Sequence, residues 1–150
     1  MKKEHLRLIC ISSLICVVAS SLLGASNAPE EKEVEQLMEK RTVIMEKVLS
    51  GDISFDEGSS KLMQIEDGSL YTRDINSIRE YACSDYDRVL SMKTENMQMK
   101  GHVADLMIFS CDVLWTCLGY DGIYTKKVSY NIGAEDTGKG LKLVTFEIVK

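Results

Sequence analysis

The sequence predicts an α+β protein in which helices come first and an antiparallel sheet follows. Apolar residues recur every three or four positions in the first half of the chain, and they alternate with polar residues in the second half. Helices followed by strands are typical of α+β architectures rather than of alternating βαβ units. We therefore expect a targeting segment at residues 1–28 and a single α+β domain at residues 29–150. In that domain about three helices, the first two forming a hairpin, would pack on a curved antiparallel sheet of three to four strands.

The first 28 residues have the three parts of a bacterial-style secretory signal. A basic start (Lys2, Lys3 and Arg7) precedes a sixteen-residue stretch without charge (8–23), and small residues follow. Cleavage after Ser26 is the better prediction, because cleavage after Ala28 would place Pro29 next to the scissile bond. The alternative is an uncleaved membrane anchor at residues 8–25, near the lower limit of about 17–25 residues for a membrane-spanning helix. In both cases the basic start stays in the cytoplasm and the rest of the chain is exported.

Charge limits the kinds of partner. The net charge of the 150-residue chain is −5, and removal of residues 1–26, with three cations and one anion, leaves −7. Nucleic acids and anionic membrane surfaces are bound by clustered Lys and Arg, which this composition does not provide. We expect a protein partner or a small ligand, with membrane contact only through residues 8–25 if they are not cleaved.

The first predicted helix covers residues 29–49. Pro29 suits the first turn of a helix, and the acidic residues beside it favour the positive end of the helix dipole. Arg41 lies on the apolar stripe, and we interpret it as a side chain whose stem packs while its charged head stays in water. The stripe consists of Val34, Leu37, Met38, Ile44, Met45 and Val48.

Two more helices are predicted before the strands begin. Ser54 and Glu57 have the spacing of a capping box, which indicates a second helix ending near Asp67. Its apolar residues are Leu62, Met63 and Ile65, whereas Gly58 weakens it. A third helix is expected from Thr72 to Cys83, with Ile75, Ile78 and Ala82 on one face.

The second half of the chain has strand signals. We expect an edge strand at residues 89–100, a strand at 124–132 and a last strand at 141–149, with a tight turn at 120–122. Residues 133–140 match most of a phosphate-binding loop, but Gly140 replaces its Ser or Thr and a strand follows, so we interpret them as a hairpin loop. Residues 102–118 also fit a helical stripe. Their apolar residues fill both faces, however, which favours one long central strand with a bulge near Ser110–Asp112.

The cysteines and the single tryptophan are expected to be core residues. On one strand, Cys111 and Cys117 would lie about 20 Å apart, too far for a disulfide. Their spacing is not that of a redox pair, and zinc would need more ligands than the chain supplies. A bond from Cys83 to either of them is left open. Trp115 lies in the most apolar segment, so we expect it to be buried against the first helix.

Evidence for catalysis is sparse. His102 is the only histidine outside the signal segment, and it could act as acid or base with Asp105 or Asp112 in a small cavity-type enzyme. No nucleophile motif accompanies it, so we predict no enzyme, no catalytic residues, no metal site and no cofactor, and we name no ligand-binding residues. An alternative interpretation of the six tyrosines is that they line a cleft between helices and sheet: Tyr71, Tyr81, Tyr86, Tyr120, Tyr124 and Tyr130.

Helices followed by a curved antiparallel meander behind an export signal resemble exported members of the nuclear-transport-factor-two-like (cystatin-like) superfamily. The resemblance covers roughly residues 30–150 and is one of element order. It implies a helix-wrapped sheet around a cone-shaped cavity, and many exported members are binding or assembly modules. Our leading hypothesis is an exported, non-enzymatic binding or interaction module of a bacterial cell envelope. The alternatives are the enzyme that uses His102 and a membrane-tethered subunit of a secretion or conjugation machine.

Overall fold

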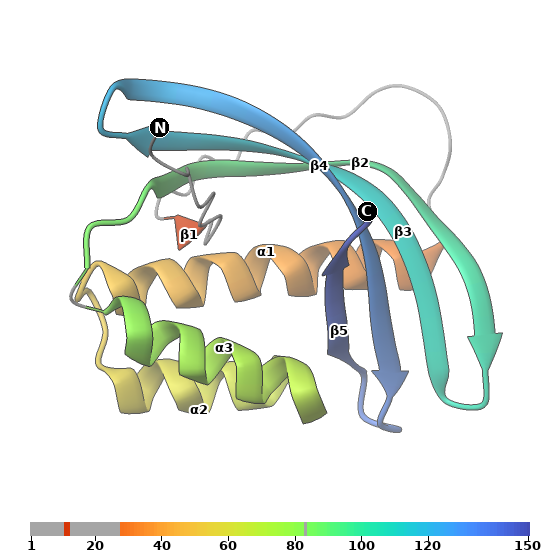
Figure 1. Cartoon of the computed structure of the whole chain (residues 1–150). Coiled ribbons are helices and arrows are strands. Elements are labelled where there is room, and N and C mark those ends of the chain that lie inside the picture. Colours follow the sequence, from red (N-terminus) through yellow and green to blue (C-terminus); the bar gives the residue numbers. More distant parts are fainter. Residues whose placement is uncertain (1–10, 13–27, 83) are drawn as a thin grey trace.

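The computed structural model describes residues 11–12, 28–82 and 84–150 and confirms the α+β class (Figure 1). The predicted signal or anchor segment lies almost entirely outside the described residues. The elements in chain order are β1 (Ile11–Ser12), α1 (Pro29–Leu49), α2 (Phe55–Ile65), α3 (Gly68–Tyr81), β2 (Arg88–Val103), β3 (Leu106–Gly119), β4 (Gly122–Asp136) and β5 (Leu141–Ile148).

The three helices lie on the concave side of a strongly curved sheet (Figure 1). The sheet order is β1-β2-β3-β4-β5, in which β2 to β5 form an antiparallel meander and β1 pairs in parallel with the start of β2. α1 runs along the inside of the curve, and α2 folds back beside it as the predicted hairpin (Figure 1). Ser54 starts α2 as predicted, because its hydroxyl oxygen accepts a hydrogen bond from the Glu57 N–H at 3.1 Å.

The prediction of one long strand from His102 to Leu118 was wrong. A tight turn at Ala104–Asp105 divides this segment, so His102 belongs to the end of β2 and β3 begins at Leu106. Ala104 has a φ of 53°, which is uncommon for a residue with a side chain. Neither turn residue is a glycine, and that is why the turn was missed.

The predicted bulge lies on the neighbouring strand. β3 pairs with β4 without interruption from Leu106 to Gly119. β2 has three register shifts against β3, and one of them lies between Glu95 and Gln98, opposite Asp112 and Ser110, where Asn96 has a φ of 55°. The irregularity is therefore at the predicted level of the sheet but in the partner strand.

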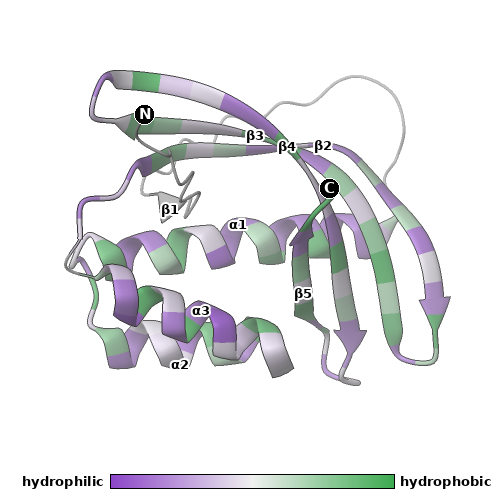
Figure 2. Ribbon diagram, viewed as in Figure 1, coloured by the Kyte–Doolittle hydropathy of each residue, from purple (hydrophilic) through white to green (hydrophobic). Residues whose placement is uncertain are grey.

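Only one face of β3 is buried. The side chains at alternate positions from Met107 to Cys117 point into the core, whereas those on the other face are partly or fully exposed. The expectation of a strand covered on both faces was wrong, because the three helices of the described part of the chain lie on the concave side (Figure 1) and alternate residues on the other face of β3 are partly or fully exposed. Figure 2 shows the resulting mixture of hydrophilic and hydrophobic residues along the strands.

The core consists of two hydrophobic clusters, and α1 contributes one half of its length to each. Its N-terminal half (Val34, Leu37 and Met38) packs on the sheet. Its C-terminal half contacts α2 and α3 instead, through Met45, Val48 and Leu49. Ile44 and Val48 of the predicted apolar stripe belong to this second cluster and not to the cluster on the sheet.

Trp115 is buried as predicted. Its side chain is 2% exposed, and its Nε1 donates a hydrogen bond to the Tyr130 hydroxyl at 3.1 Å. The two rings also meet edge to face at a centroid distance of 6.3 Å. Trp115 belongs to the same cluster as the N-terminal half of α1, so the sheet and this helix share one core.

Several predicted boundaries shift because of tertiary contacts. α2 ends at Ile65 rather than near Asp67, since Glu66 and Asp67 meet Leu143 of β5, and the Asp67 N–H donates to the Leu143 carbonyl at 3.0 Å. α3 begins at Gly68 rather than Thr72, because the Asp67 carboxylate caps it through the Gly68 N–H at 2.7 Å. β4 continues to Asp136, which shortens the predicted loop to four residues before β5.

Candidate functional site

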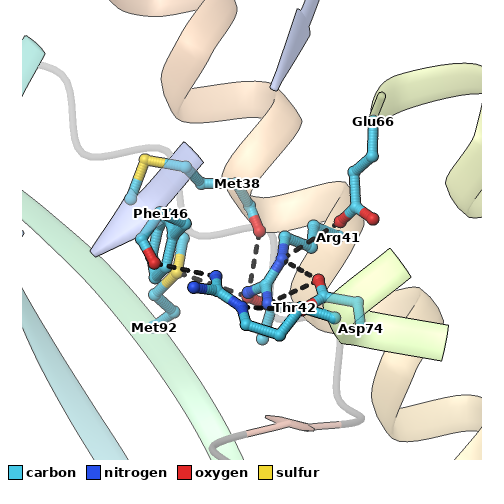
Figure 3. A network of polar contacts seen from close by, with 8 residues as sticks. Met38, Arg41, Thr42, Glu66, Asp74, Met92 and Phe146 are labelled. Carbon is cyan, nitrogen blue, oxygen red and sulfur yellow. Dashed lines mark hydrogen bonds and ion pairs between the residues drawn. The ribbon is translucent and has the colours of Figure 1, made fainter. Parts of the chain in front are cut away.

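Arg41 is buried in a network of charges, so the prediction that its head stays in water was wrong. The residue is only 9% exposed, and its guanidinium lies between the carboxylates of Glu66 and Asp74 (Figure 3). Its Nε lies 3.1 Å from Glu66 Oε1 and donates to Asp74 Oδ2 at 2.6 Å. The guanidinium carbon also stacks 4.8 Å from the centre of the Phe146 ring. One side chain thus links α1 to α3, to the end of α2 and to β5.

The two carboxylates of this network are almost completely enclosed. Glu66 is 1% exposed and Asp74 is 2% exposed. Burial raises the pKa of Glu66, nearby Arg41 opposes the rise, and the charge of Asp74 adds to it. A strongly perturbed carboxyl often marks an active site, but a catalytic group has to reach its substrate. These groups are enclosed between α1, α3, the end of α2 and β5, where no substrate can reach them. Their role is structural, and we call such a buried ion pair that holds elements together a clamp.

A third buried carboxylate lies near the C-terminal end of α1. Glu46 is 0% exposed, and its Oε1 accepts a hydrogen bond from Arg88 Nε at 3.0 Å. Burial raises the pKa of Glu46 to about 7, with Arg88 opposing the shift. The pair ties the C-terminal half of α1 to the start of β2 and is also structural.

Neither clamp was identified from the sequence. A partial signal was present for Arg41, because it interrupts the apolar stripe of α1, and a charge in such a position needs a partner when it is buried. Glu66 and Asp74 had no comparable signal, because their burial depends on how α2 and α3 meet the sheet.

His102 and Asp105 both line an open groove at the end of the sheet where the β2–β3 and β4–β5 hairpins meet the start of α1. The groove has a volume of about 690 Å³, and Glu30, Glu33 and Asp136 also border it. Asp136 Oδ1 accepts from the Gly138 N–H at 2.7 Å, and Glu33 Oε1 accepts from the Leu141 N–H at 3.0 Å. Two of these carboxylates therefore stabilise the local backbone. The groove collects negative charge around one histidine, but the described residues contain no cluster of metal-binding side chains.

Asp112, the other proposed partner of His102, lies elsewhere. On the convex face, its carboxylate accepts hydrogen bonds from Ser129 at 2.6 Å and from Asn96 at 3.0 Å. These hydrogen bonds, together with Lys127 at 3.3 Å, lower its pKa to about 2. The structure thus brings His102 near Asp105 but not near Asp112.

The cysteines behave as expected for core residues. No disulfide joins Cys111 to Cys117, and both are buried on the concave face of β3. Burial raises the pKa of Cys111 to about 12, so its thiol stays protonated at neutral pH. Cys83 lies outside the described residues, and its pairing stays open.

The six tyrosines do not share a cleft. Tyr130 is in the sheet core, whereas Tyr71, Tyr81 and Tyr86 pack against the helix cluster. Tyr120 stands apart at the turn between β3 and β4. The interpretation of a tyrosine-lined cleft was therefore wrong.

Exposed apolar side chains gather at the turn between β3 and β4. Tyr120 is 102% exposed, and the cross-strand pair Leu118 and Ile123 is 41% and 68% exposed. We call residues 118–123 the hairpin end. Tyrosine at an exposed position is common among residues that dominate protein–protein binding. The sequence predicted the turn, but not that its apolar residues would face outward.

The hairpin end is held in place from the concave side. The Tyr124 hydroxyl donates to Asp87 Oδ2 at 2.7 Å, and burial and then this hydrogen bond raise the pKa of the tyrosine. Gly119 allows Asp87 and Tyr124 to lie close to the backbone of β3, since a Cβ at this position would lie 3.0 Å from Asp87 Oδ1 and 3.2 Å from the Tyr124 ring. The exposed residues are therefore presented on a fixed support.

The first half of β4 has an open edge beside the hairpin end. β4 pairs with β3 along its whole length, but its pairing with β5 begins only at Tyr130. In Figure 1 this half of β4 forms the upper margin of the sheet. Among the described residues, no strand pairs with the outer side of β4 between Ile123 and Val128.

The fold and these surfaces define a class, namely α+β proteins in which three helices pack inside a curved antiparallel meander. Searches for a matching family model and for a similar curated protein found none. Among solved structures, the crystal structure of the intermembrane space region of the chloroplast protein ARC6 is similar at 12% identity. The match has a TM-score of 0.49 and covers 82% of this chain and 98% of that chain.

Proposed function

We propose that this protein is an exported, non-enzymatic interaction module of a bacterial cell envelope that binds a protein partner through the hairpin end. The observation that carries the proposal is the exposed apolar group of Leu118, Tyr120 and Ile123 on a fixed support. An exposed apolar group beside unpaired backbone is unfavourable in water and is typical of a binding surface.

The charged side chains support a binding role over a catalytic one. The carboxyls whose pKa is raised most, those of Glu46 and Glu66, are enclosed and paired with arginines. His102 faces an open groove in which two of the carboxylates hydrogen-bond to the backbone. The two enclosed carboxyls cannot reach a substrate, and His102 and Asp105 share the groove without a hydrogen bond between their side chains.

Export is proposed from the sequence of residues 1–28. N-terminal sequencing of the native protein tests it, and a mature start near Asn27 or Pro29 is the expected result. Intact chain recovered from membranes would favour the tethered alternative instead. Among the described residues, none of the helices has the length and apolarity needed to span a bilayer.

We also propose membership of the nuclear-transport-factor-two-like superfamily. The arrangement that supports it is a long first helix inside a curved antiparallel sheet, with two shorter helices packed beyond it.

The binding proposal is tested with a photo-crosslinking amino acid placed at Tyr120 in the full-length protein in its native host. Met63 is the matched control, because it is also an exposed apolar residue, 54% exposed, but lies on α2. A discrete crosslinked product from position 120 and none from position 63 is the expected result. Equal labelling at both positions, or none at either, would contradict the proposed site.

A further inference from the structure

We propose that the open edge of β4 binds an extended, acidic peptide segment of the partner as an additional β-strand. This inference rests on the proposed function, because it specifies how the partner meets the surface beside the hairpin end. The site consists of the backbone of Ile123, Thr125 and Lys127 and the side chains around it.

The direction of the backbone groups follows from one hydrogen bond. The Ser129 carbonyl accepts from the Val149 N–H at 2.9 Å, so the backbone groups of Ser129 point toward the β5 side. Because alternate residues of a strand point their N–H and C=O groups to the same side, those of Lys127, Thr125 and Ile123 also face this side. β5 ends at Ile148, before it reaches them. Three donors and three acceptors thus form a row that no described strand occupies.

Such a row is a ready template for strand addition. An incoming strand antiparallel to β4 would continue the line of β5 and reach the hairpin end. There its side chains would contact Ile123, which lies beside its β3 partner Leu118 and close to the turn residue Tyr120. Main-chain hydrogen bonds would provide affinity, and alternate side chains would provide specificity.

Charge selects the kind of strand. The segment Ile123–Ser129 contains Lys126 and Lys127 and no acidic residue. Lys127 is already paired with Glu95 at 3.1 Å and with Asp112 at 3.3 Å, but half of its side chain remains exposed. Carboxylates on the incoming strand would be attracted mainly to Lys126, because Glu95 and Asp112 already neutralise Lys127, and lysines there would be repelled by Lys126.

The same lysines disfavour a second copy as the occupant. In a twofold antiparallel pairing of two β4 edges centred on this segment, the two Lys126 side chains would meet on one face of the sheet and the two Lys127 side chains on the other. Like charges that face each other across strands are destabilising, and lysines on edge strands commonly prevent self-association. The occupant is therefore a different, acidic segment.

The first experiment uses the purified full-length protein and a synthetic eight-residue peptide of alternating valine and glutamate. The matched control peptide alternates valine and lysine. We expect the acidic peptide to slow amide hydrogen exchange at Ile123, Thr125 and Lys127 and to bind at least about tenfold more tightly, a difference of about 1.4 kcal/mol. Equal binding of the two peptides would overturn the charge argument, and protection elsewhere would overturn the site.

Two variants separate backbone pairing from side-chain contact. Thr125→Pro removes one outward N–H, and proline is tolerated on an edge strand where the N–H faces solvent. Thr125→Ala keeps the N–H. We expect the proline variant to lose at least about tenfold in affinity and the alanine variant to stay within about twofold. If the proline variant does not fold, N-methylation of alternate residues of the acidic peptide removes the same hydrogen bonds and should abolish binding. Unchanged binding in either test would overturn strand addition.

The crosslink at Tyr120 distinguishes failure of this inference from failure of the proposed function. A crosslink that persists in the Thr125→Pro protein would leave the binding surface intact and refute strand addition. A crosslinked product of two copies of this chain would refute the acidic partner. Absence of any crosslink in the unmodified protein would refute the proposed function itself.

Discussion

Replacement of Arg41 tests whether the buried charge network clamps the helices to the sheet. Arg41→Met keeps most of the apolar stem but removes the guanidinium that lies between Glu66 and Asp74. Glu66 then loses its counter-charge, Asp74 keeps only Arg73 at 3.8 Å, and the Phe146 ring loses its stacked partner at 4.8 Å.

The expected loss follows from burial. Removal of one partner from a buried ion pair typically costs about 3–5 kcal/mol, because it leaves an uncompensated charge in the interior. That loss is a large part of a typical stability of about 5–15 kcal/mol. The matched control is Arg79→Met, because Arg79 is exposed and stacks 5.0 Å from the Phe55 ring. Loss of an exposed stacking contact costs only about 0.5–1 kcal/mol.

Urea denaturation at pH 7.5 and pH 5 measures both effects. The Arg41→Met protein should regain stability at pH 5, because Glu66, whose pKa is already raised by burial, is neutralised by a proton. The triple variant Arg41→Met, Glu66→Gln and Asp74→Asn should recover much of the loss at pH 7.5, since neutral amides need no counter-charge. If Arg41→Met loses no more than Arg79→Met at either pH, the guanidinium is solvated and the clamp does not exist.

Three further predictions concern the rest of the core. The pKa of Glu46 is raised from 4.5 to about 7, so its contribution to stability is fully present below pH 4.5 and is lost as the pH rises through about 7. In the Glu46→Gln protein, the fall in unfolding free energy between pH 5 and pH 8 should therefore be smaller by at most about 3 kcal/mol. Urea denaturation at both pH values measures it, and the same fall in the variant as in the original protein would contradict this prediction. Trp115→Ala should lower the free energy of unfolding by about 3–5 kcal/mol. The tryptophan fluorescence of the native protein should be blue-shifted and poorly quenched by iodide. Emission like that of free indole would show an exposed ring and contradict the burial. Gly58→Ala should destabilise the protein by about 1–3 kcal/mol despite the better helix propensity of alanine, because a Cβ there would overlap the Val48 side chain. Ser60→Ala in the same helix is the control and should not lower the melting temperature.

Gly58 shows why local rules were insufficient for the helices. In isolation this glycine weakens α2, and the sequence suggested that alanine would be better. The close approach of α1 and α2 at Val48 reverses the expectation. Helix propensity depends on the residue itself, whereas the space at a helix contact depends on a neighbour ten residues earlier in the chain.

The candidate site was only partly predictable. The turn at residues 120–122 and the alternation of the fourth strand followed from glycine chemistry and from the period of two. That β5 stops at Ile148 and leaves half of β4 without a partner could not be read from either strand alone. Strand lengths and register are set by pairing, and pairing joins residues that are distant in sequence.

What the sequence by itself determined is the class of the protein: α1 at Pro29–Leu49, the α1–α2 hairpin, the later antiparallel strands and the burial of Trp115 and the cysteines. These features depend on local hydrophobic periodicity and turn residues, which a single segment carries. Only the tertiary structure decided which charges are enclosed, which face of the sheet stays open and which strand edge lacks a neighbour. Arg41 illustrates the difference, because a charge on an apolar stripe can extend to water or pair with buried carboxylates. The outcome depends on whether α3 and the end of α2 bring Asp74 and Glu66 within hydrogen-bonding distance.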